Sequence, residues 1–358
     1  MGRAQVRPYG LVFDRQENTP YQAVCQTTRL PFASIMPRTL FLLTPLKVKG
    51  GNYGTISRIR SHLVKHGHTC LLWDMEEMEA VGDINTVLRE HHVDLVIGIH
   101  AFRTGRFMKD SKIPYILILG GTDVNEFSKK HEHMTVMSEA VYNARFVIAF
   151  NEALQKKALT IWPNISRGRL AVIKQESEFE PSASKESDSG DEGDHVCDNA
   201  VITSPCSVSN FCLYTCLHNN YGVREPEDQH IFLLVGAVRP VKGPLFLVDT
   251  ISAWHKKNPK ILFVIVGPVS DQTYFQQEFR PALDRSEGVI HIPGLPFEST
   301  HTAMLQAFAL VNSSQSEGMS LAVLEAMQLG LPVLARDIPG NTSIIQDGHN
   351  GLLFRTPQ

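Results

Sequence analysis

The chain has 358 residues, of which 43% are hydrophobic and 20% are charged, so it can build sizeable buried cores. At roughly 150 residues per domain, this length predicts two domains or one large one. Lys and Arg total 34 against 37 Asp and Glu, a near balance that argues against a nucleic-acid partner. No apolar run reaches the roughly 18–20 residues that cross a bilayer, and the first residues lack the apolar core of a secretory signal. Composition therefore predicts no membrane span and a cytoplasmic location, with secretion as the alternative.

Six cysteines are too few for a disulfide framework in a chain of this size. The four that cluster in one irregular stretch are Cys197, Cys206, Cys212 and Cys216. A metal site is one interpretation of this cluster, but it contains no CxxC pair, and His195 and His218 lie at spacings unlike those of zinc sites. We therefore predict free thiols and no metal ligands.

The N-terminal part of the chain alternates between strand and helix patterns after an irregular leader at 1–37, which contains four prolines. Strands are predicted at 37–45, 69–73, 94–99, 115–119, 146–150 and 170–174. Helices are predicted at 56–65, 84–90, 134–142 and 152–159. Strands separated by helices of about ten residues are typical of a parallel sheet with helices on both faces. Residues 38–175 are thus predicted to form a Rossmann-like domain.

The alternation stops at Glu176. Residues 176–194 contain eight acidic residues, five serines and one lysine, and such a segment cannot bury enough apolar area to offset its ordering entropy. We predict a disordered linker or insertion over 176–229, within which 211–217 could form a strand or a turn of helix.

The alternation resumes in residues 230–358. Strands are predicted at 231–236, 261–267, 288–292, 309–314 and 332–335, with helices at 244–257, 271–284, 300–307 and 320–329. The predicted fold class is therefore α/β, with two Rossmann-like, doubly wound domains facing a cleft beyond the carboxyl ends of their strands. A nicotinamide-dependent dehydrogenase also fits this pattern, but no G-x-G-x-x-G follows a strand.

Two loops of the second domain carry the charged groups that indicate a ligand site. Arg239 and Lys242 lie between a predicted strand and a helix, where cations and helix N–H groups can bind a diphosphate. The alternative is a tight turn with solvated cations. In the other loop Glu317 precedes a helix, and Glu325 stands eight residues later. These carboxylates could accept hydrogen bonds from ribose and sugar hydroxyls, whereas a lone Glu325 would by default be a solvated helix residue.

These residues form a pattern that resembles the group 1 glycosyltransferase family, which is retaining, uses nucleotide sugars and has the GT-B fold. The pattern is G-x5-K-G at 236–243, E-G-x6-E-A-M-x2-G-x-P-V at 317–333, I-P-G-N at 338–341 and D-G-x-N-G-L-L-F at 347–354. The resemblance implies that Arg239 and Lys242 neutralise the donor diphosphate, that Glu317 contacts the transferred sugar and that Glu325 contacts the ribose. It also implies that the backbone amides of Gly318, Met319 and Ser320 reach sugar and phosphate.

The first domain supplies further candidates through the same resemblance. Gly50 and Gly51 correspond to a glycine-rich loop near the donor phosphate, although a plain strand–helix turn is the alternative. His100 corresponds to a histidine that touches the donor sugar, although a histidine at a strand end is often structural. Asp123 could bind an acceptor hydroxyl or cap the following turn.

The resemblance implies a retaining hexosyltransferase-like enzyme that moves a sugar from a nucleotide-diphosphate sugar, its donor substrate, to an unidentified acceptor hydroxyl. It implies no cofactor and no required metal. Family members usually continue past N-G-L-L-F into a helix that crosses back to the first domain, so the C-terminal crossing helix is expected to be missing from a second domain that ends at Gln358. The alternative is therefore a catalytically silent, truncated nucleotide-sugar-binding or regulatory protein.

Overall fold

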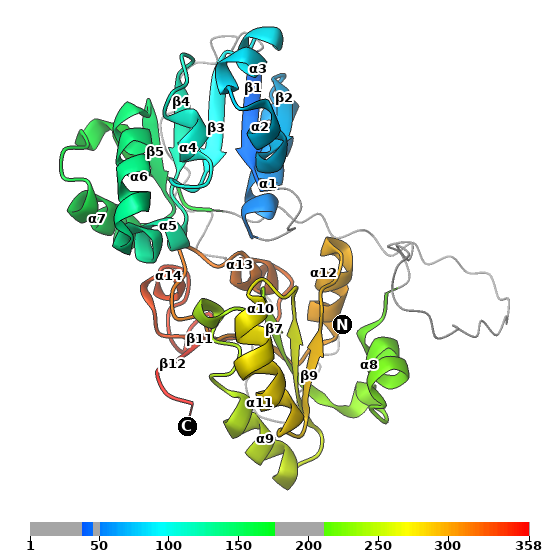
Figure 1. Ribbon diagram of the computed structural model, residues 1–358. Helices are drawn as coiled ribbons and strands as arrows, with labels where there is room; N and C mark the ends of the chain where they lie inside the picture. The colour runs from blue at the N-terminus through cyan, green and yellow to red at the C-terminus, as the bar shows by residue number, and fades with distance from the viewer. Residues whose placement is uncertain (1–37, 46–50, 176–210, 358) are drawn as a thin grey trace, which may run out of the picture. The chain divides into compact units, whose positions relative to one another are not determined.

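The structure is a computed structural model that describes residues 38–45, 51–175 and 211–357. The strands of its first half are β1 (Thr39–Thr44), β2 (Thr69–Asp74), β3 (Leu95–Ile99), β4 (Tyr115–Ile118), β5 (Phe146–Ala149) and β6 (Leu170–Val172). Its helices are α1 (Gly51–Lys65), α2 (Met75–Val81), α3 (Ile84–Glu90), α4 (Gly105–Met108), α5 (Gly121–Asn125), α6 (His131–Asn143) and α7 (Glu152–Ile161) (Figure 1). The strands form one parallel sheet in the order β2-β1-β3-β4-β5-β6.

The second half repeats this architecture. Its strands are β7 (His230–Val235), β8 (Ile261–Val266), β9 (Val289–Ile292), β10 (Ala309–Asn312), β11 (Val333–Arg336) and β12 (Leu352–Phe354). Its helices are α8 (Leu213–Tyr221), α9 (Val248–Lys257), α10 (Gln272–Tyr274), α11 (Arg280–Asp284), α12 (Phe297–Gln306), α13 (Leu321–Gln328) and α14 (Pro339–Thr342). This sheet is also parallel, in the order β12-β11-β10-β7-β8-β9. The predicted α/β class with two parallel sheets is confirmed.

The strand order creates a reversal point in each sheet. In the first sheet the chain runs from β1 outward to β2 and then returns to the other side of β1 as β3. In the second sheet it runs outward from β7 through β8 and β9 and returns to the other side of β7 as β10. Ligands of open α/β sheets bind beyond the carboxyl ends of the strands at such points. The loops after β1, β3, β7 and β10 are therefore the places to look for a site.

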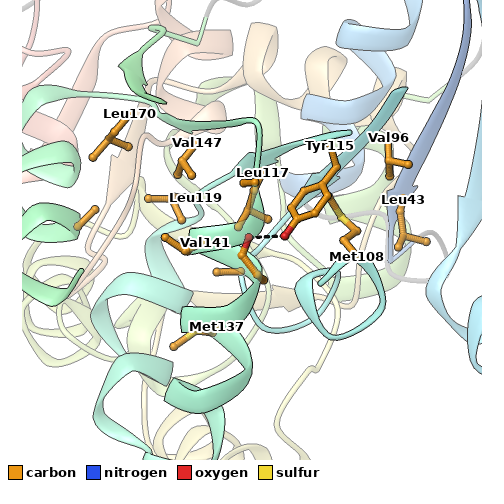
Figure 2. Packing of buried hydrophobic residues seen from close by; sticks show 14 of the residues in the cluster. Leu43, Val96, Met108, Tyr115, Leu117, Leu119, Met137, Val141, Val147 and Leu170 are labelled. Atoms are coloured by element: carbon orange, nitrogen blue, oxygen red, sulfur yellow. Dashed lines mark hydrogen bonds between the residues drawn. The ribbon is translucent and has the colours of Figure 1, made fainter. Parts of the chain in front are cut away.

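The first sheet is covered on both faces because its strands are apolar at successive positions. Phe41 and Leu43 of β1 point into a cluster formed with helices α2, α3, α6 and α7, while Leu42 points into a cluster with α1. Both faces of this strand are fully buried. The hydroxyl of Tyr115 lies within this cluster and donates to the backbone carbonyl of Ala140 at 2.5 Å (Figure 2). A polar atom among apolar side chains is thus satisfied by a helix.

The second sheet shows the same two-faced burial. Ile231 and Leu233 of β7 pack with α8, α12 and α13, and the alternating residues Phe232 and Leu234 pack with α9 and α11 on the other face. The two sheets belong to one unit of the chain, Arg38–Gln358. No helix among the described residues combines the length and the apolar character needed to span a membrane.

Helix α8 corrects the prediction of a disordered segment over 176–229. Residues 211–229 are described, and they contain α8 followed by a left-handed Gly222 that ends the helix. Leu213 and Leu217 are fully buried in the core of the second half. The prediction is wrong for this stretch because leucines four residues apart lie on one helical face and bury area that the acidic stretch before them cannot. Residues 176–210, like the leader at 1–37, lie outside the described residues.

Helix α8 gives a first test of the fold. Leu217→Ala is expected to lower the free energy of unfolding by about 2–5 kcal/mol, because a buried leucine is replaced by a cavity. Asn219→Ala, an exposed position of the same helix, is expected to change it by less than about 0.5 kcal/mol. Urea denaturation of both variants measures this difference. Equal small effects would show that α8 does not contribute to the core.

Candidate functional site

Two loops at the reversal point of the second sheet are joined by hydrogen bonds to backbone carbonyls. The loop Arg239–Gly243 follows β7, and the loop 313–320 follows β10. The Gln315 N–H donates to the Val241 carbonyl at 2.8 Å, and the Ser313 hydroxyl donates to the Gly243 carbonyl at 2.8 Å. Gly243 has a φ of +57°, and a Cβ on it would lie 2.5 Å from the Ser313 carbonyl oxygen. Glycine is therefore required where the two loops meet.

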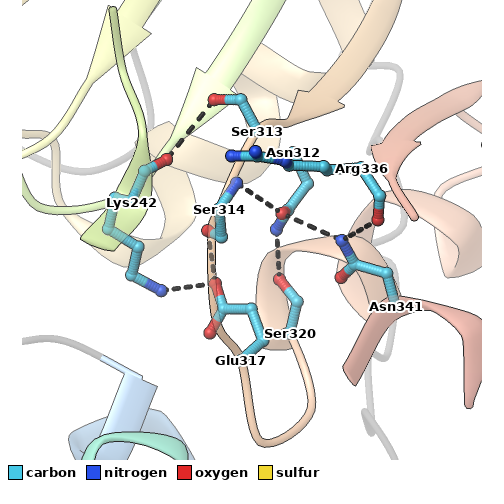
Figure 3. A network of polar contacts seen from close by, with 8 residues as sticks. All are labelled: Lys242, Asn312, Ser313, Ser314, Glu317, Ser320, Arg336 and Asn341. Carbon is cyan, nitrogen blue, oxygen red and sulfur yellow. Dashed lines mark hydrogen bonds and ion pairs between the residues drawn. The ribbon is translucent and has the colours of Figure 1, made fainter. Parts of the chain in front are cut away.

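Lys242 and Glu317 form an ion pair between these loops. The Lys242 ammonium lies 2.6 Å from Glu317 Oε1, and the Ser314 hydroxyl donates to the same oxygen at 2.8 Å (Figure 3). The two charged side chains are 23% and 11% exposed. Burial raises the pKa of Glu317, but the charges of Lys242 and Arg239 and the hydrogen bonds outweigh burial, so the pKa lies below its ordinary value. Glu317 is therefore a carboxylate at neutral pH.

A buried asparagine fixes the shape of the 313–320 loop. Asn312 Oδ1 accepts from the Ser314 N–H and from the Asn341 side chain, each at 3.2 Å, and its Nδ2 donates to the Ser320 hydroxyl at 2.9 Å (Figure 3). Ser320 is the N-cap of α13, but its side chain makes no capping bond. The network thus engages the hydroxyl that would ordinarily accept from the first N–H groups of the helix.

The backbone N–H groups at the start of α13 remain available. Among the described residues, the N–H groups of Gly318, Met319 and Ser320 donate no hydrogen bond. All three residues are buried, and they lead into a helix whose N-terminus carries partial positive charge. The loop therefore presents donors and a favourable dipole for an anion or an electronegative oxygen.

Arg239 and Glu325 are the two other charged candidates of the second half. The Arg239 guanidinium forms no ion pair with a described residue, although its charge lowers the pKa of Glu317. Glu325 is only 8% exposed; its Oε2 lies 3.6 Å from His301 Nε2, and its Oε1 is buried and accepts no hydrogen bond from a described residue. Glu325 is thus not a solvated helix residue, and one of its oxygens is left for a donor outside the protein.

His100 is held in one tautomer at the end of β3. It is 1% exposed and has a φ of +87°, a backbone conformation uncommon for residues other than glycine. Its Nδ1 accepts from the backbone N–H groups of Phe102 and Arg103, each at 3.2 Å. Burial, together with the charges of Arg103 and Arg239, lowers the pKa of His100 to about 3. The ring is therefore neutral with its proton on Nε2, which is buried and has no partner among the described residues.

The two halves touch at the backbone of Gly318. A Cβ on Gly121, the first residue of α5, would lie 2.4 Å from the Gly318 nitrogen, and a Cβ on Gly340 would lie 2.5 Å from the Glu317 carbonyl oxygen. The side chain of Asn151, which caps α7 through its Oδ1, donates through Nδ2 to the Gly318 carbonyl. Glycines on both sides thus allow the Glu317–Gly318 peptide to pack between α5 and α14.

The structure describes some of the remaining candidate residues and not others. The carboxylate of Asp123 accepts from the backbone N–H groups of Ala101, Gly120 and Val124, so the capping interpretation describes it. Gly51 is the exposed first residue of α1. Gly50 lies outside the described residues. Of the cysteines in the predicted free-thiol cluster, Cys212 and Cys216 are described, and both are free.

A cavity of about 430 Å³ lies next to Glu317. Its walls come from both halves: residues 125–129 and 151–157 on one side, and residues 315–317 and 338–340 on the other. The described residues that line it include Glu317, but not Arg239, Lys242, His100 or Glu325. Val241 also lines the cavity, so both Glu317 and the loop that carries Arg239 and Lys242 border it.

Arg103 is a charged residue of this region that sequence reasoning missed. It follows His100 by three residues at the end of β3, and the charge of Arg239 from the second half lowers its pKa, second only to the effect of burial. The sequence did contain a signal, because an arginine after a strand that borders a reversal point is placed near a ligand. A single arginine in a loop, however, does not show which charges face it.

Solved structures identify the fold. The crystal structure of WaaG, a glycosyltransferase involved in lipopolysaccharide biosynthesis, matches with a TM-score of 0.62 at 16% identity, covering 88% of this chain and 85% of that one. The crystal structure of Anabaena Alr3699/HepE in complex with UDP-glucose matches with a TM-score of 0.62 at 14% identity, covering 89% and 86%. The fold is therefore that of GT-B glycosyltransferases.

Sequence comparison identifies the family. The family model described as glycosyl transferases group 1 matches residues 221–358. Over 320 residues the chain is 35% identical to glycosyltransferase 1 domain-containing protein 1 of Xenopus tropicalis, covering 89% of this chain and 84% of that protein. The chain belongs to the group 1 glycosyltransferase family, and this membership supports the transfer of a sugar from a donor.

The contact at Gly318 predicts a steric effect. Gly121→Ala is expected to lower the free energy of unfolding by about 1–3 kcal/mol, because the added methyl group overlaps the backbone of Gly318. Gly168→Ala is the matched control, since the nearest atom to its added Cβ lies 4.0 Å away. Chemical denaturation of both variants gives the comparison, and equal stabilities would contradict the close packing of the two halves at this peptide.

The neutral state of His100 predicts a pH dependence. The pKa of His100 is 6.5 in the unfolded chain and about 3 in the folded protein. At pH values between these two, His100 binds a proton only in the unfolded state. Stability is therefore lost as the pH falls below about 6.5, by up to about 1.4 kcal/mol per pH unit from this residue. His100→Asn, which tolerates a positive φ, removes this contribution.

Unfolding free energies of wild type and His100→Asn, measured from pH 7.5 to pH 5, test this expectation. The difference between the two proteins should change in favour of the variant as the pH falls. Asp123, whose pKa burial raises to about 6, titrates in both proteins and cancels in the difference. A difference that stays constant over this range would show that His100 is not buried in its neutral form.

Proposed function

We propose that this protein transfers a sugar from a nucleotide-diphosphate sugar to an acceptor hydroxyl, with retention of anomeric configuration and without a required metal ion. The observation that carries the proposal is the Lys242–Glu317 pair beside three unused backbone N–H groups at the start of α13. It is supported by the fold shared with Anabaena Alr3699/HepE, whose crystal structure is a complex with UDP-glucose.

The donor is bound mainly by the second half. The loops after β7 and β10, at the reversal point of the second sheet, carry Arg239, Lys242 and the N–H groups of residues 318–320. They supply positive charge and hydrogen-bond donors to the diphosphate. The buried, unpartnered Oε1 of Glu325 accepts from a ribose hydroxyl.

The same groups promote departure of the leaving group. Breaking the bond to the anomeric carbon leaves negative charge on the diphosphate and positive charge on the sugar ring. Fixed cations and N–H donors stabilise the negative charge on the diphosphate, and the Glu317 carboxylate stabilises the positive charge on the sugar ring. The cations on the chain provide the charge that a metal ion would otherwise bring. The Nε2–H of His100, which cannot accept a proton at neutral pH, donates to a sugar hydroxyl.

The cavity beside Glu317 provides space for the transferred sugar and the acceptor. Its volume of about 430 Å³ lies in the range of small-molecule sites. Because its walls come from both halves, an acceptor bound there would be held against the donor on one side of Glu317. Such positioning converts the reaction of two molecules into a step within one complex.

Binding and turnover of UDP-glucose test the proposal. Lys242→Ala is expected to weaken UDP binding about 10- to 100-fold, because a charge-assisted contact is worth about 1.5–3 kcal/mol. Glu317→Gln keeps the side-chain volume and is expected to lower the rate of sugar release on the order of 10²-fold or more. Lys260→Ala, which removes an exposed ion pair with Asp228, is the control. Turnover that persists unchanged in the first two variants would contradict the assigned site.

The finer parts of the proposal have separate readouts. NMR of the product from an α-linked donor is expected to show an α-linkage, and activity is expected to persist in EDTA. If the nucleotide sugar binds but no sugar is released with any acceptor or to water, the chain is a binding protein rather than an enzyme.

A further inference from the structure

The cavity beside Glu317 is lined by two lysines that the assigned donor site does not use. Lys129 ends the 3₁₀ helix Phe127–Lys129, and Lys157 lies in α7; both line the cavity from the first half. The Lys157 ammonium donates to the side-chain oxygen of Asn125, another lining residue. One wall of the cavity therefore carries two ammonium groups, and a hydrogen bond within that wall holds one of them.

No described carboxylate pairs with these two ammonium groups. Neither lysine forms an ion pair with a described residue. Glu126 lines the same wall, but its Oε1 is buried and makes no hydrogen bond with a described residue. Glu317, on the other side of the cavity, is bonded to Lys242. The charge of Lys129, after burial, lowers the pKa of Lys157, as expected for two like charges that line one cavity.

The facing wall offers neutral polar groups. Gln315 and Ser316 line the cavity from the second half, and their side chains make no hydrogen bond with a described residue. An amide and a hydroxyl both donate and accept hydrogen bonds, so they suit the hydroxyl groups of a sugar or polyol. Glu317 follows them in the same wall, where the proposed function places the transferred sugar. A ligand of this cavity therefore meets hydroxyl-binding groups on one side and cations on the other.

We propose that the acceptor is a small hydroxylated phosphate ester, whose phosphate is bound by Lys129 and Lys157. The inference rests on the proposed function, because it names the acceptor of that reaction. A phosphate monoester carries a charge of about −1.5 to −2 at neutral pH, which matches two ammonium groups better than the single charge of a carboxylate. A cavity of about 430 Å³ has the size of a small-molecule site.

The transfer step leaves the phosphate ester intact. The anomeric carbon of the donor loses its bond to the diphosphate oxygen and gains a bond to the acceptor hydroxyl oxygen. The hydroxyl proton passes to the leaving nucleoside diphosphate. Lys129 and Lys157 take no part in these bond changes; they bind the far end of the acceptor and so direct one of its hydroxyls toward the side of Glu317.

Calorimetric titration of the UDP-saturated protein tests the phosphate site, because UDP then occupies the donor site. Glucose 6-phosphate is expected to bind about tenfold more tightly than glucose, with glucuronic acid between them. The double variant Lys129→Gln/Lys157→Gln is expected to lose this preference and to bind UDP as wild type does. Lys130→Gln/Lys156→Gln is the matched control, since it removes the same charge from neighbouring exposed lysines that do not line the cavity.

A transfer assay tests whether the bound phosphate ester is the acceptor. The wild type is incubated with UDP-glucose and a pool of sugar and polyol phosphates, and the same pool treated with a phosphatase is the control. Mass spectrometry is expected to find phosphorylated products one hexose unit heavier with the untreated pool. The Lys129→Gln/Lys157→Gln variant is expected to form them about tenfold more slowly at low acceptor concentration. Equal or faster transfer to the dephosphorylated pool would overturn the inference.

The binding results separate this inference from the proposed function. If UDP binds but glucose 6-phosphate binds no more tightly than glucose, or binds equally to wild type and to the double variant, the acceptor inference is wrong and the proposed function stands. If the double variant loses UDP as much as glucose 6-phosphate, the two lysines serve the donor. If UDP, GDP and ADP all fail to bind the wild type, both are wrong.

Discussion

The position of one peptide, Glu317–Gly318, constrains the rest of the site. It packs between Gly121 at the start of α5 and Gly340 in α14, with clearances that admit no Cβ on either side. The side chain of Asn151, from the first half, donates to the carbonyl of Gly318, which belongs to the next peptide. Because the Glu317–Gly318 peptide lies between β10 and α13, its position also sets where the Glu317 carboxylate and the first N–H groups of the helix point. The packing of this peptide therefore both joins the two halves and positions the groups of the site.

The polar groups around that peptide divide into two sets. One set is satisfied within the protein: Asn312 bonds the Asn341 amide and the loop, and Asp123 bonds three backbone N–H groups. The other set is left without protein partners, including the Nε2 of His100 and one oxygen of Glu325. Buried polar groups are almost always hydrogen-bonded. Groups that break this rule on both sides of one interface are best explained by a ligand that completes them.

Sequence patterns predicted the strands well because both faces of each sheet are covered. Fully buried parallel strands appear as short apolar runs, and the runs at 94–99 and 261–267 correspond to β3 and β8. For 211–217 the sequence left a strand and a turn of helix open, because the two leucines that α8 buries lie in a stretch with cysteines and polar residues and have no neighbouring helical pattern. Short helices such as α4 and α5 also escaped, since four or five residues are too few to establish a helical period.

The sequence by itself determined the α/β class, the parallel sheets and the loops that carry Arg239, Lys242, Glu317 and Glu325, because these follow from local periodicity and spacing. Only the tertiary structure decided which charges are paired. Lys242 and Glu317 are 75 residues apart and bond each other, whereas His100 Nε2 and Glu325 Oε1 are buried without a partner among the described residues. The physical reason is that burial and the distance between charges, which set the energy of each ionised group, exist only once the chain is folded.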